Sequence, residues 1–152
     1  MSDAPFIRDL RSQDLAQLLA LYDEHLHSAD EPRPEAARVD ALWRQIEDDP
    51  ALHYLGAFDG ERMVASCCAA VVPNLTRGCR PWAVIENVVC HADYRRRGLA
   101  SDVIRAMLER CREAGVYKVM LMSAAHRGES VHAFYEANGF DKHAKQAFLW
   151  KP

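Results

Sequence analysis

The chain has 152 residues, 49% of them hydrophobic and 27% charged, which is typical of one globular domain with a substantial core. A formal net charge of -3 at pH 7 argues against a general nucleic-acid binder, because such proteins carry a basic surface. No apolar run is long enough to span a membrane, and residues 1–10 lack the apolar stretch of a signal peptide. We therefore expect a single domain over residues 1–152, a cytoplasmic location, and no nucleic-acid or membrane partner.

The cysteines and histidines give no metal-binding pattern. Five cysteines lie at positions 67, 68, 79, 90 and 111, and no two of them form a C-x-x-C pair. An odd number of cysteines without metal-ligand spacing is unusual for a zinc site or a disulfide framework, so we expect reduced thiols and no bound metal. His25 and His27 form an H-x-H pair, but the sequence places no further ligand beside them. We interpret both as solvated histidines.

The predicted elements follow the spacing of apolar residues, with a period of two in strands and 3.6 in helices. Ser12 and Asp14 offer N-cap chemistry, and Gly115 and Gly139 are typical helix stops. In chain order we expect a strand at 6–10, a helix from 15 to about 22, a loop at 25–34, a helix at 36–47, strands at 53–58 and 63–72, a loop at 73–81, a strand at 82–90, a helix from 98 to about 114, a strand at 118–123, a helix at 130–138 and a last strand at 148–150. This order predicts a mixed α/β (α+β) fold with a mostly antiparallel sheet flanked by helices.

The stretch from Ile85 to Arg105 has the pattern of a buried strand, a short basic turn and a helix. The turn holds three consecutive arginines and then Gly98, with the small Ala100 two residues further on. Small residues let the backbone approach a ligand closely, and a helix N-terminus offers unpaired N–H groups to an anion. Arginine side chains add charge-assisted donors for a phosphate or pyrophosphate. We interpret the turn as a phosphate cradle, with solvated surface arginines as the simpler alternative.

Two motifs give the chain a resemblance to the GNAT superfamily of N-acetyltransferases. The pattern R-x-x-G-x-A over 95–100, after the strand end V-V-C-H-A-D-Y, resembles the acetyl-CoA-binding motif of that superfamily, and F-Y-E-A-N-G-F over 134–140 resembles its later signature. Within the superfamily both stretches are most similar to small-molecule amine acetyltransferases such as the glucosamine-6-phosphate and aminoalkylphosphonate enzymes. The resemblance implies a GNAT-like acyl-CoA N-acyltransferase fold, acetyl-CoA as the acyl donor, and a V-shaped opening between the Trp82 and Lys118 strands.

The resemblance also implies which residues bind the acyl donor. The backbone N–H groups expected to meet the acetyl carbonyl oxygen are those of Val88, Val89 and Cys90. The residues expected to hold the pyrophosphate are Arg95, Arg96, Arg97, Gly98, Leu99, Ala100 and Ser101. Many relatives have an asparagine before the second motif that contacts the pantetheine arm, whereas here Gly128 or Ser130 falls nearest. We assign Ser130 and Phe134 to the acyl-donor site, although Phe134 also suits simple packing on its helix.

Glu86 and Tyr135 are the candidate catalytic residues. An alkyl ammonium has a reference pKa of about 10.4, so the acceptor amine must lose a proton before it attacks, and Glu86 could take that proton through a water molecule. A structural carboxylate, held by an arginine or capping a backbone, is an equally weighted alternative. Asn87 would point away from Glu86 unless a bulge intervenes. Tyr135, whose counterpart lies near the sulfur in relatives, could donate a proton to the leaving thiolate.

We therefore expect an N-acetyltransferase that moves an acetyl group directly from acetyl-CoA to a primary amine of a small molecule. Direct transfer needs no nucleophilic Cys90, and no His–Asp partner pattern surrounds it. Glu24, Asp30 and Glu31 could attract a cationic amine, although a polar loop is the simpler interpretation. One alternative is a protein or peptide N-acetyltransferase, which an open acidic groove between the early loop and the 73–81 loop would favour, whereas a closed pocket would favour the small molecule. Another is a non-catalytic acyl-CoA-binding regulatory module. The resemblance also favours a homodimer.

Overall fold

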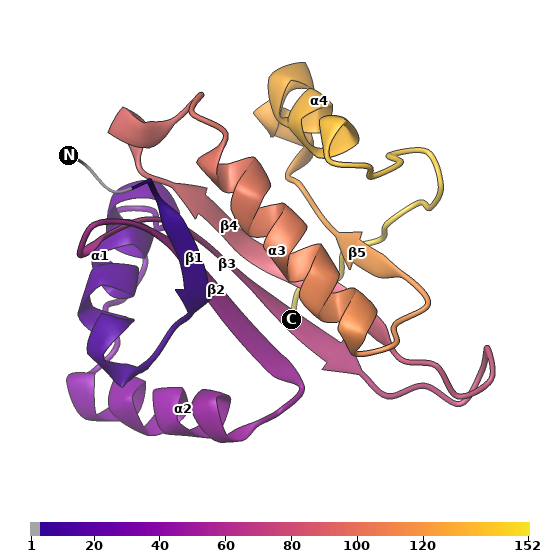
Figure 1. Ribbon diagram of the computed structural model, residues 1–152, viewed down its shortest axis with the longest axis horizontal. Coiled ribbons are helices and arrows are strands. Elements are labelled where there is room, and N and C mark those ends of the chain that lie inside the picture. Colours follow the sequence, from indigo (N-terminus) through magenta and orange to yellow (C-terminus); the bar gives the residue numbers. More distant parts are fainter. Residues whose placement is uncertain (1–3) are drawn as a thin grey trace.

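Five strands form one sheet in the order β1-β2-β3-β4-β5 in the computed structural model, which describes residues 4–152 (Figure 1). The elements are β1 (Phe6–Asp9), α1 (Leu15–His25), α2 (Ala36–Asp48), β2 (Leu52–Asp59), β3 (Arg62–Val72), β4 (Trp82–Cys90), α3 (Leu99–Glu113), β5 (Val119–Leu121) and α4 (Glu129–Ala137). Strands β1 to β4 pair antiparallel in sequence order, and β5 pairs parallel with β4. The predicted mixed fold with a mostly antiparallel sheet is therefore confirmed.

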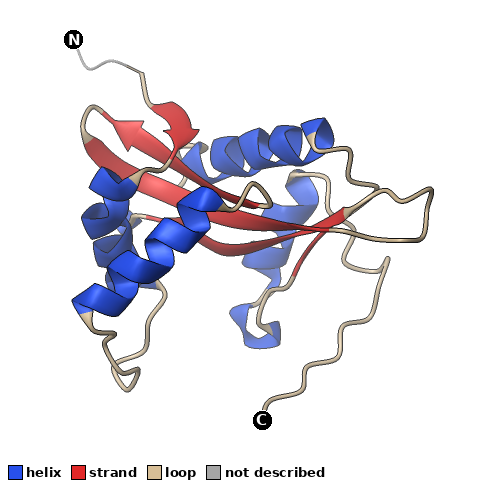
Figure 2. Cartoon of the chain, turned by 90° about the horizontal axis from the view of Figure 1, so that it is seen from below, coloured by secondary structure: helices blue, strands red, loops and turns tan. Residues whose placement is uncertain are grey.

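Helices cover both faces of the sheet, with α3 on one face and α1 and α2 on the other (Figures 1 and 2). Strand β3 is buried from Met63 to Ala69 without interruption, because both of its faces meet a helical layer. The apolar cluster beneath α3 includes Leu55, Val64, Ala83 and Ile85, with Leu99, Val103, Met107 and Cys111 from the helix. The cluster on the opposite face includes Leu18, Leu21, Trp43, Phe58, Met63 and Val89.

Helix α3 follows its sequence pattern closely. Leu99, Val103, Ile104, Met107 and Cys111 recur every three or four residues, and all five are buried against the sheet. The helix ends at Glu113, and Gly115 follows it with a φ of 75°, the left-handed conformation that glycine adopts without strain. This packing fixes the N-terminal end of α3, and hence the basic turn before it, against the end of β4.

Strand β4 separates from β5 halfway along its length. Only Ala83–Ile85 of β4 pairs with Val119–Leu121, so 86–90 has no strand on that side within the described chain. A register shift between Ser66 and Cys68 of β3 marks a bulge in β4, and Asn87 adopts a φ of 52° there. The opening expected between β4 and β5 is thus present. The bulge that was considered as the condition for turning Asn87 is present as well.

The predicted strand at 148–150 does not form, and β5 is shorter than the predicted 118–123. Residues 141–152, the C-terminal tail, contain no helix or strand and extend away from the sheet (Figure 2). Phe148, Leu149 and Trp150 are 91%, 78% and 82% exposed. The β-forming side chains are present, but a strand exists only beside a neighbour that accepts its backbone hydrogen bonds, and the tail has none within one described chain.

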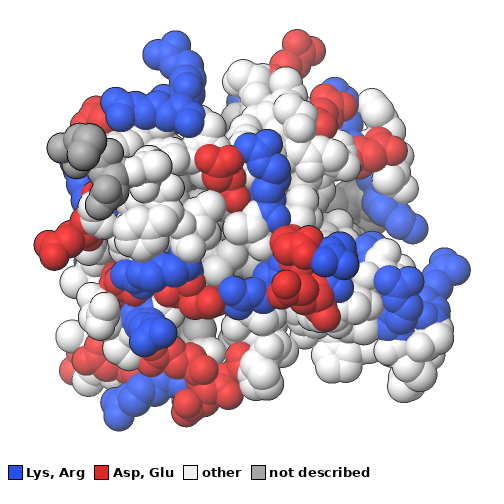
Figure 3. All heavy atoms as spheres, in the orientation of Figure 1, with Lys and Arg blue, Asp and Glu red and all other residues white. Residues whose placement is uncertain are grey.

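Acidic and basic side chains are interspersed over the face seen in Figure 3, in keeping with the small net charge. Basic side chains gather at one end of this face, over the turn between β4 and α3 (Figure 3). None of the described helices is long and apolar enough to cross a membrane.

Candidate functional site

A cleft of about 630 Å³ opens where β4 has parted from β5. Its walls come from the end of α1, the end of β4, the turn before α3, the first turn of α3, and α4. The lining residues are His25, Leu26, Val88, Val89, Cys90, Tyr94, Arg95, Arg96, Gly98, Leu99, Ala100, Ser101, Arg127, Ser130, Val131, Phe134 and Tyr135. All the residues expected to bind the acyl donor line this cleft except Arg97. Tyr135 lines it as well, and Glu86 does not.

The first turn of α3 is built to accept an anion. Gly98 is the N-cap residue with a φ of 81°, and no side chain caps the helix. The N–H groups of Leu99, Ala100 and Ser101 precede the first intrahelical bond, from Asp102 N–H to the Gly98 carbonyl, so they have no carbonyl within the helix. These three donors and the positive end of the helix dipole lie at the cleft beside Arg95 and Arg96. The turn therefore fits a pyrophosphate.

Arg97 stands apart from the cradle. Its guanidinium carbon lies 4.9 Å from the centre of the Tyr94 ring, and the Tyr94 hydroxyl donates a hydrogen bond to Asp59 at 3.0 Å. A cation over an aromatic face is attracted by the ring electrons. The Arg97 side chain thus packs on the short turn at 92–94, and any part of Arg97 in the phosphate cradle falls to its backbone N–H group, as expected for most of the cradle.

Helix α4 forms the opposite wall of the cleft and is tied to α3. The Asn138 side-chain amide donates to Ser101 Oγ at 3.0 Å and to the Phe134 carbonyl at 2.8 Å. This contact holds the start of α3 and the end of α4 together. Of the two residues considered for the pantetheine contact, Ser130 lines the cleft, whereas Gly128 is the N-cap residue of α4 and does not.

Tyr135 lies in the α4 wall with its ring against Phe134 and Phe140, at centroid separations of 5.0 and 6.2 Å. Burial raises the pKa of Tyr135 above its ordinary value, which keeps the phenol protonated at neutral pH. Glu86 is exposed on β4 near Tyr135, and its charge adds slightly to that increase in the Tyr135 pKa. No arginine or lysine forms an ion pair with Glu86 in the described part of the chain.

Comparison with known proteins agrees with this geometry. Residues 17–140 match the model of the acetyltransferase (GNAT) family. This chain belongs to the GNAT family. It is 39% identical over 88 residues to a glucosamine 6-phosphate N-acetyltransferase of Trypanosoma brucei brucei, a match that covers 58% of this chain and 57% of that protein.

Two further relatives resemble this GNAT-family chain. It is 33% identical over 105 residues to a probable glucosamine 6-phosphate N-acetyltransferase 2 of Oryza sativa subsp. japonica, covering 69% of this chain and 57% of that protein. A solved structure of an Agrobacterium tumefaciens str. C58 protein assigned as an acetyltransferase superposes with a TM-score of 0.88 at 35% identity, over 97% of this chain and 99% of the other. The matched region thus spans 57% of the length of each curated relative.

The cysteine of this GNAT site is not activated. Cys90 lines the cleft, and burial raises the pKa of its thiol, with a smaller opposing effect of Arg95. Its thiol donates a weak hydrogen bond to the His91 carbonyl at 3.7 Å. Because the thiolate is the nucleophilic form, a raised pKa leaves Cys90 a poor nucleophile, in keeping with direct transfer.

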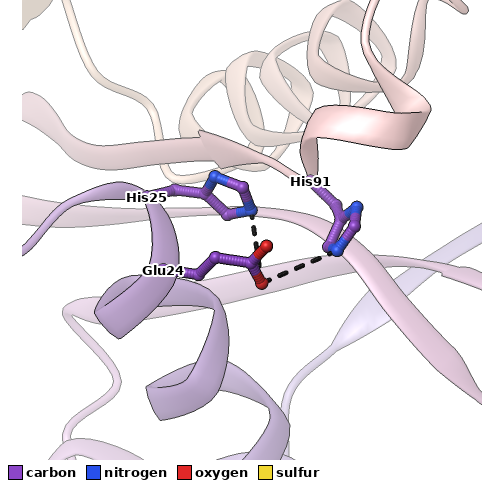
Figure 4. Close-up of side chains that lie close together, drawn as sticks. All are labelled: Glu24, His25 and His91. Carbon is purple, nitrogen blue, oxygen red and sulfur yellow. Dashed lines mark ion pairs between the residues drawn. The ribbon is translucent and has the colours of Figure 1, made fainter.

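Glu24 and His91 lie close to His25, which lines the cleft, and the sequence analysis did not predict this grouping (Figure 4). One Glu24 carboxylate oxygen lies 3.7 Å from His25 Nε2 and 3.6 Å from His91 Nε2. The two imidazoles meet edge to face at 5.3 Å. The interpretation of His25 as a solvated histidine was wrong, because its side chain is only 7% exposed, whereas His27 is partly exposed and binds Asp23 at 2.9 Å. Nothing in the sequence linked the end of α1 to the residue after β4.

Proposed function

We propose that this protein is an acetyl-CoA-dependent N-acetyltransferase that transfers an acetyl group directly to a primary amine of a small molecule. The observation that carries the proposal is that one cleft brings together the uncapped N-terminus of α3, the free end of β4 and the protonated Tyr135. A cleft of several hundred Å³ is of the size that small ligands occupy. The curated relatives are named for glucosamine 6-phosphate, so a phosphorylated amino sugar is the acceptor class we favour.

Each part of the cleft has a task in this reaction. The first turn of α3 with Arg95 and Arg96 holds the pyrophosphate of acetyl-CoA, and the backbone of 88–90 meets the carbonyl oxygen of the acetyl group. The amine nitrogen attacks the carbonyl carbon, the C–S bond breaks, and the nitrogen gives up a proton. Tyr135 donates its phenolic proton to the departing sulfur and regains one from water in the open cleft. The products are the amide and free CoA thiol.

The alternative acceptor, a protein or peptide amine, requires a groove that joins the early loop to the 73–81 loop. Leu26 of the early loop lines the cleft, whereas Pro73, Asn74 and Leu75 line a separate hollow of about 750 Å³ beside Arg110 and Glu113. Because the two loops contribute to different hollows, the geometry favours the small-molecule acceptor.

Calorimetric titration with acetyl-CoA, desulfo-CoA and ADP tests the acyl donor, and thiol release with glucosamine 6-phosphate, glucosamine and a lysine peptide tests the acceptor. We expect saturable binding of acetyl-CoA with Kd below about 1 mM and thiol release with the amino sugars. Absence of binding at that concentration would refute the acyl-donor site. Binding without turnover on any amine would instead identify a regulatory acyl-CoA-binding module.

We also propose that the protein is a homodimer in which the C-terminal tail of one copy adds to the β5 edge of the other. Within the described chain, no residue after Cys111 is fully buried. That region nonetheless holds an open sheet edge at Val119–Leu121 and the exposed Phe148, Leu149 and Trp150. If each copy places its tail on the β5 edge of the other, the open edge and the exposed apolar side chains are covered together. The added strand also satisfies the backbone hydrogen bonds of the edge. Burying three large side chains from each copy removes roughly 1,200 Å² of side-chain surface, at the lower end of the range for stable interfaces.

Leu149→Asp tests the dimer, because it places a charge in the middle of the apolar segment. Analytical ultracentrifugation should give about twice the 17.2 kDa of one chain for the unchanged protein and one chain for the variant. Leu75→Asp is the matched control, since Leu75 is 92% exposed but belongs neither to the β5 edge nor to the tail, and should stay dimeric. Amide hydrogen exchange should show protection at 119–121 and 146–150 that is lost on dilution. Protection that is independent of concentration, or a dimer unaffected by Leu149→Asp, would contradict the exchange.

A further inference from the structure

His25 is an imidazole of the cleft whose Nε2 makes no hydrogen bond. Its side chain is 7% exposed, and the buried Nε2 has no hydrogen-bond partner in the described chain. Figure 4 shows Nε2 turned toward the Glu24 carboxylate and the other ring nitrogen, Nδ1, turned away from it. His25 lines the same cleft as Val88, Cys90 and Tyr135. It therefore adds a second titratable side chain to the space in which the acyl group and the amine must meet.

The neighbouring His91 has no such freedom. Arg62 Nη2 lies 2.9 Å from His91 Nε2, and the Asp93 backbone N–H donates to His91 Nδ1 at 3.2 Å. Donors therefore approach both ring nitrogens of His91. The same arrangement argues against a metal ion bound by Glu24, His25 and His91, because a permanently charged guanidinium occupies the nitrogen that the ion would need. His91 and Glu24 are left as the groups that orient His25.

The carboxylate fixes which nitrogen of His25 is basic. A proton on Nε2 faces the negative Glu24 oxygen at 3.7 Å, so the tautomer with Nε2–H is favoured and the lone pair remains on Nδ1. The edge of His91 against the ring, at 5.3 Å between centroids, limits its rotation. A proton acceptor requires this arrangement, with the proton on the nitrogen that faces the carboxylate and the lone pair on the other nitrogen.

We propose that His25 is a catalytic residue that takes the proton of the attacking amine, with Glu24 and His91 as positioning residues; this inference rests on the proposed N-acetyltransferase function. His25 Nδ1 takes one proton from the bound ammonium, and the neutral nitrogen then forms its bond to the acetyl carbon and releases its second proton to water. The C–S bond breaks, and the sulfur takes the proton of Tyr135. The imidazolium then releases its proton to water, and no other reactant is consumed. Glu86, outside the cleft, has no part in this step.

The charges around His25 favour this assignment at neutral pH. Burial lowers the pKa of His25 below its usual 6.5, and Arg95 and His91 act in the same direction, against Glu24 and Asp93. From α4 and the loop before it, Tyr135 and Arg127 face the cleft, and Arg62 of β3 faces His91. Since the folded pKa is lowered, the ring is neutral above that pKa and loses its capacity to accept a proton as the pH falls through it.

The test compares His25→Gln with His27→Gln, a matched control whose side chain binds Asp23 outside the cleft. The acceptor probe is glucosamine 6-phosphate, or whichever amine the panel above identifies. At pH 7 we expect His25→Gln to lower kcat/KM for the amine by about 10²-fold, a typical size for general base catalysis, with the Kd of acetyl-CoA changed by less than about twofold. His27→Gln should keep both values.

The pH profile separates a catalytic role from a structural one. In the unchanged protein, kcat/KM should rise with pH below 6.5 and then level off, because His25 becomes neutral there. In His25→Gln it should keep rising toward the pKa of the amine, so that the deficit shrinks about tenfold per pH unit. A deficit that is constant with pH would overturn the proposal and mark a structural histidine, as would an unchanged rate. Activity abolished by EDTA would make the group a metal site instead.

Failure of the His25 proposal can be distinguished from failure of the proposed N-acetyltransferase function. If the unchanged protein binds no acetyl-CoA or acetylates no amine, the proposed function fails and the pH comparison has no signal to report. If it turns over and only the His25→Gln prediction fails, the N-acetyltransferase stands and the proton acceptor lies elsewhere. Glu86→Gln, measured alongside, tests the carboxylate that the sequence analysis proposed as the base. A loss there that equals the His25→Gln loss would return the base role to Glu86.

Discussion

Tyr135→Phe should lower kcat by about 10²-fold or more while the Kd of acetyl-CoA stays within about twofold. The substitution removes only the hydroxyl, so the ring keeps its packing against Phe134 and Phe140. Without that proton the sulfur must leave as an unprotonated thiolate or be protonated by water. The lost proton transfer stabilises the transition state and not the bound ground state. The substitution therefore lowers kcat and leaves the Kd of acetyl-CoA nearly unchanged. Thiol release and calorimetry on the same preparation measure the two quantities.

Tyr117→Phe is the control for this change. Tyr117 lies just before β5, outside the cleft lining, and its ring is met by Lys118 Nζ at 5.3 Å, a contact that phenylalanine also allows. This variant should keep both kcat and Kd. Equal turnover in Tyr135→Phe and the unchanged protein would remove Tyr135 from the role of acid, and an equal rise in Kd and fall in kcat would make it a binding residue.

Gly98→Val should weaken acetyl-CoA binding about tenfold or more. Gly98 has a φ of 81°, a conformation that a β-branched residue adopts only at a cost of about 1–3 kcal/mol. A Cβ there would meet only Asp102 Oδ2 at 4.0 Å, so packing within the free protein is not the obstacle. The obstacle is the backbone conformation that presents the first N–H groups of α3, together with the close approach of the pyrophosphate. Calorimetry with acetyl-CoA and with ADP measures the loss.

Gly60→Val separates the cradle from general strain. Gly60 has a φ of 59° in the turn between β2 and β3, and nothing lies within 4 Å of the position of its Cβ. It should lose stability through the same kind of backbone strain, seen as a lower Tm, and keep its Kd for acetyl-CoA. An unchanged Kd in Gly98→Val, or equal losses in both variants, would refute the phosphate cradle at the start of α3.

Local patterns determined the elements that carry the site. The helix at 98–114 was predictable because its apolar residues recur at helical spacing, and the structure has α3 over Leu99–Glu113. The cradle was predictable because the strand end, the turn and the helix start are contiguous in the sequence. Tyr135 came from the resemblance carried by the F-Y-E-A-N-G-F motif, and the structure puts it across the cleft from the cradle.

Other features depended on which segments meet in space. The direction of Arg97 follows from the position of the Tyr94 ring, and the bulge at Asn87 follows from the register of β3 against β4. A residue pattern gives the face on which a side chain lies only if the register is regular, and a single extra residue changes it. Glu86 lies before this bulge, where β4 keeps a regular register against β3, and its side chain is exposed.

By itself the sequence determined a mixed α/β chain in which a buried strand, a basic turn and a helix follow one another, since hydrophobic periodicity, caps and a glycine turn act over a few residues. Tertiary structure alone decided that Glu24, His25 and His91 converge at the cleft, because α1 and the end of β4 are distant in sequence and meet only across the sheet. It also decided that the segment at 148–150 forms no strand within the described chain. A strand is completed by a neighbour's backbone groups, and no property of Phe148, Leu149 or Trp150 can supply that neighbour.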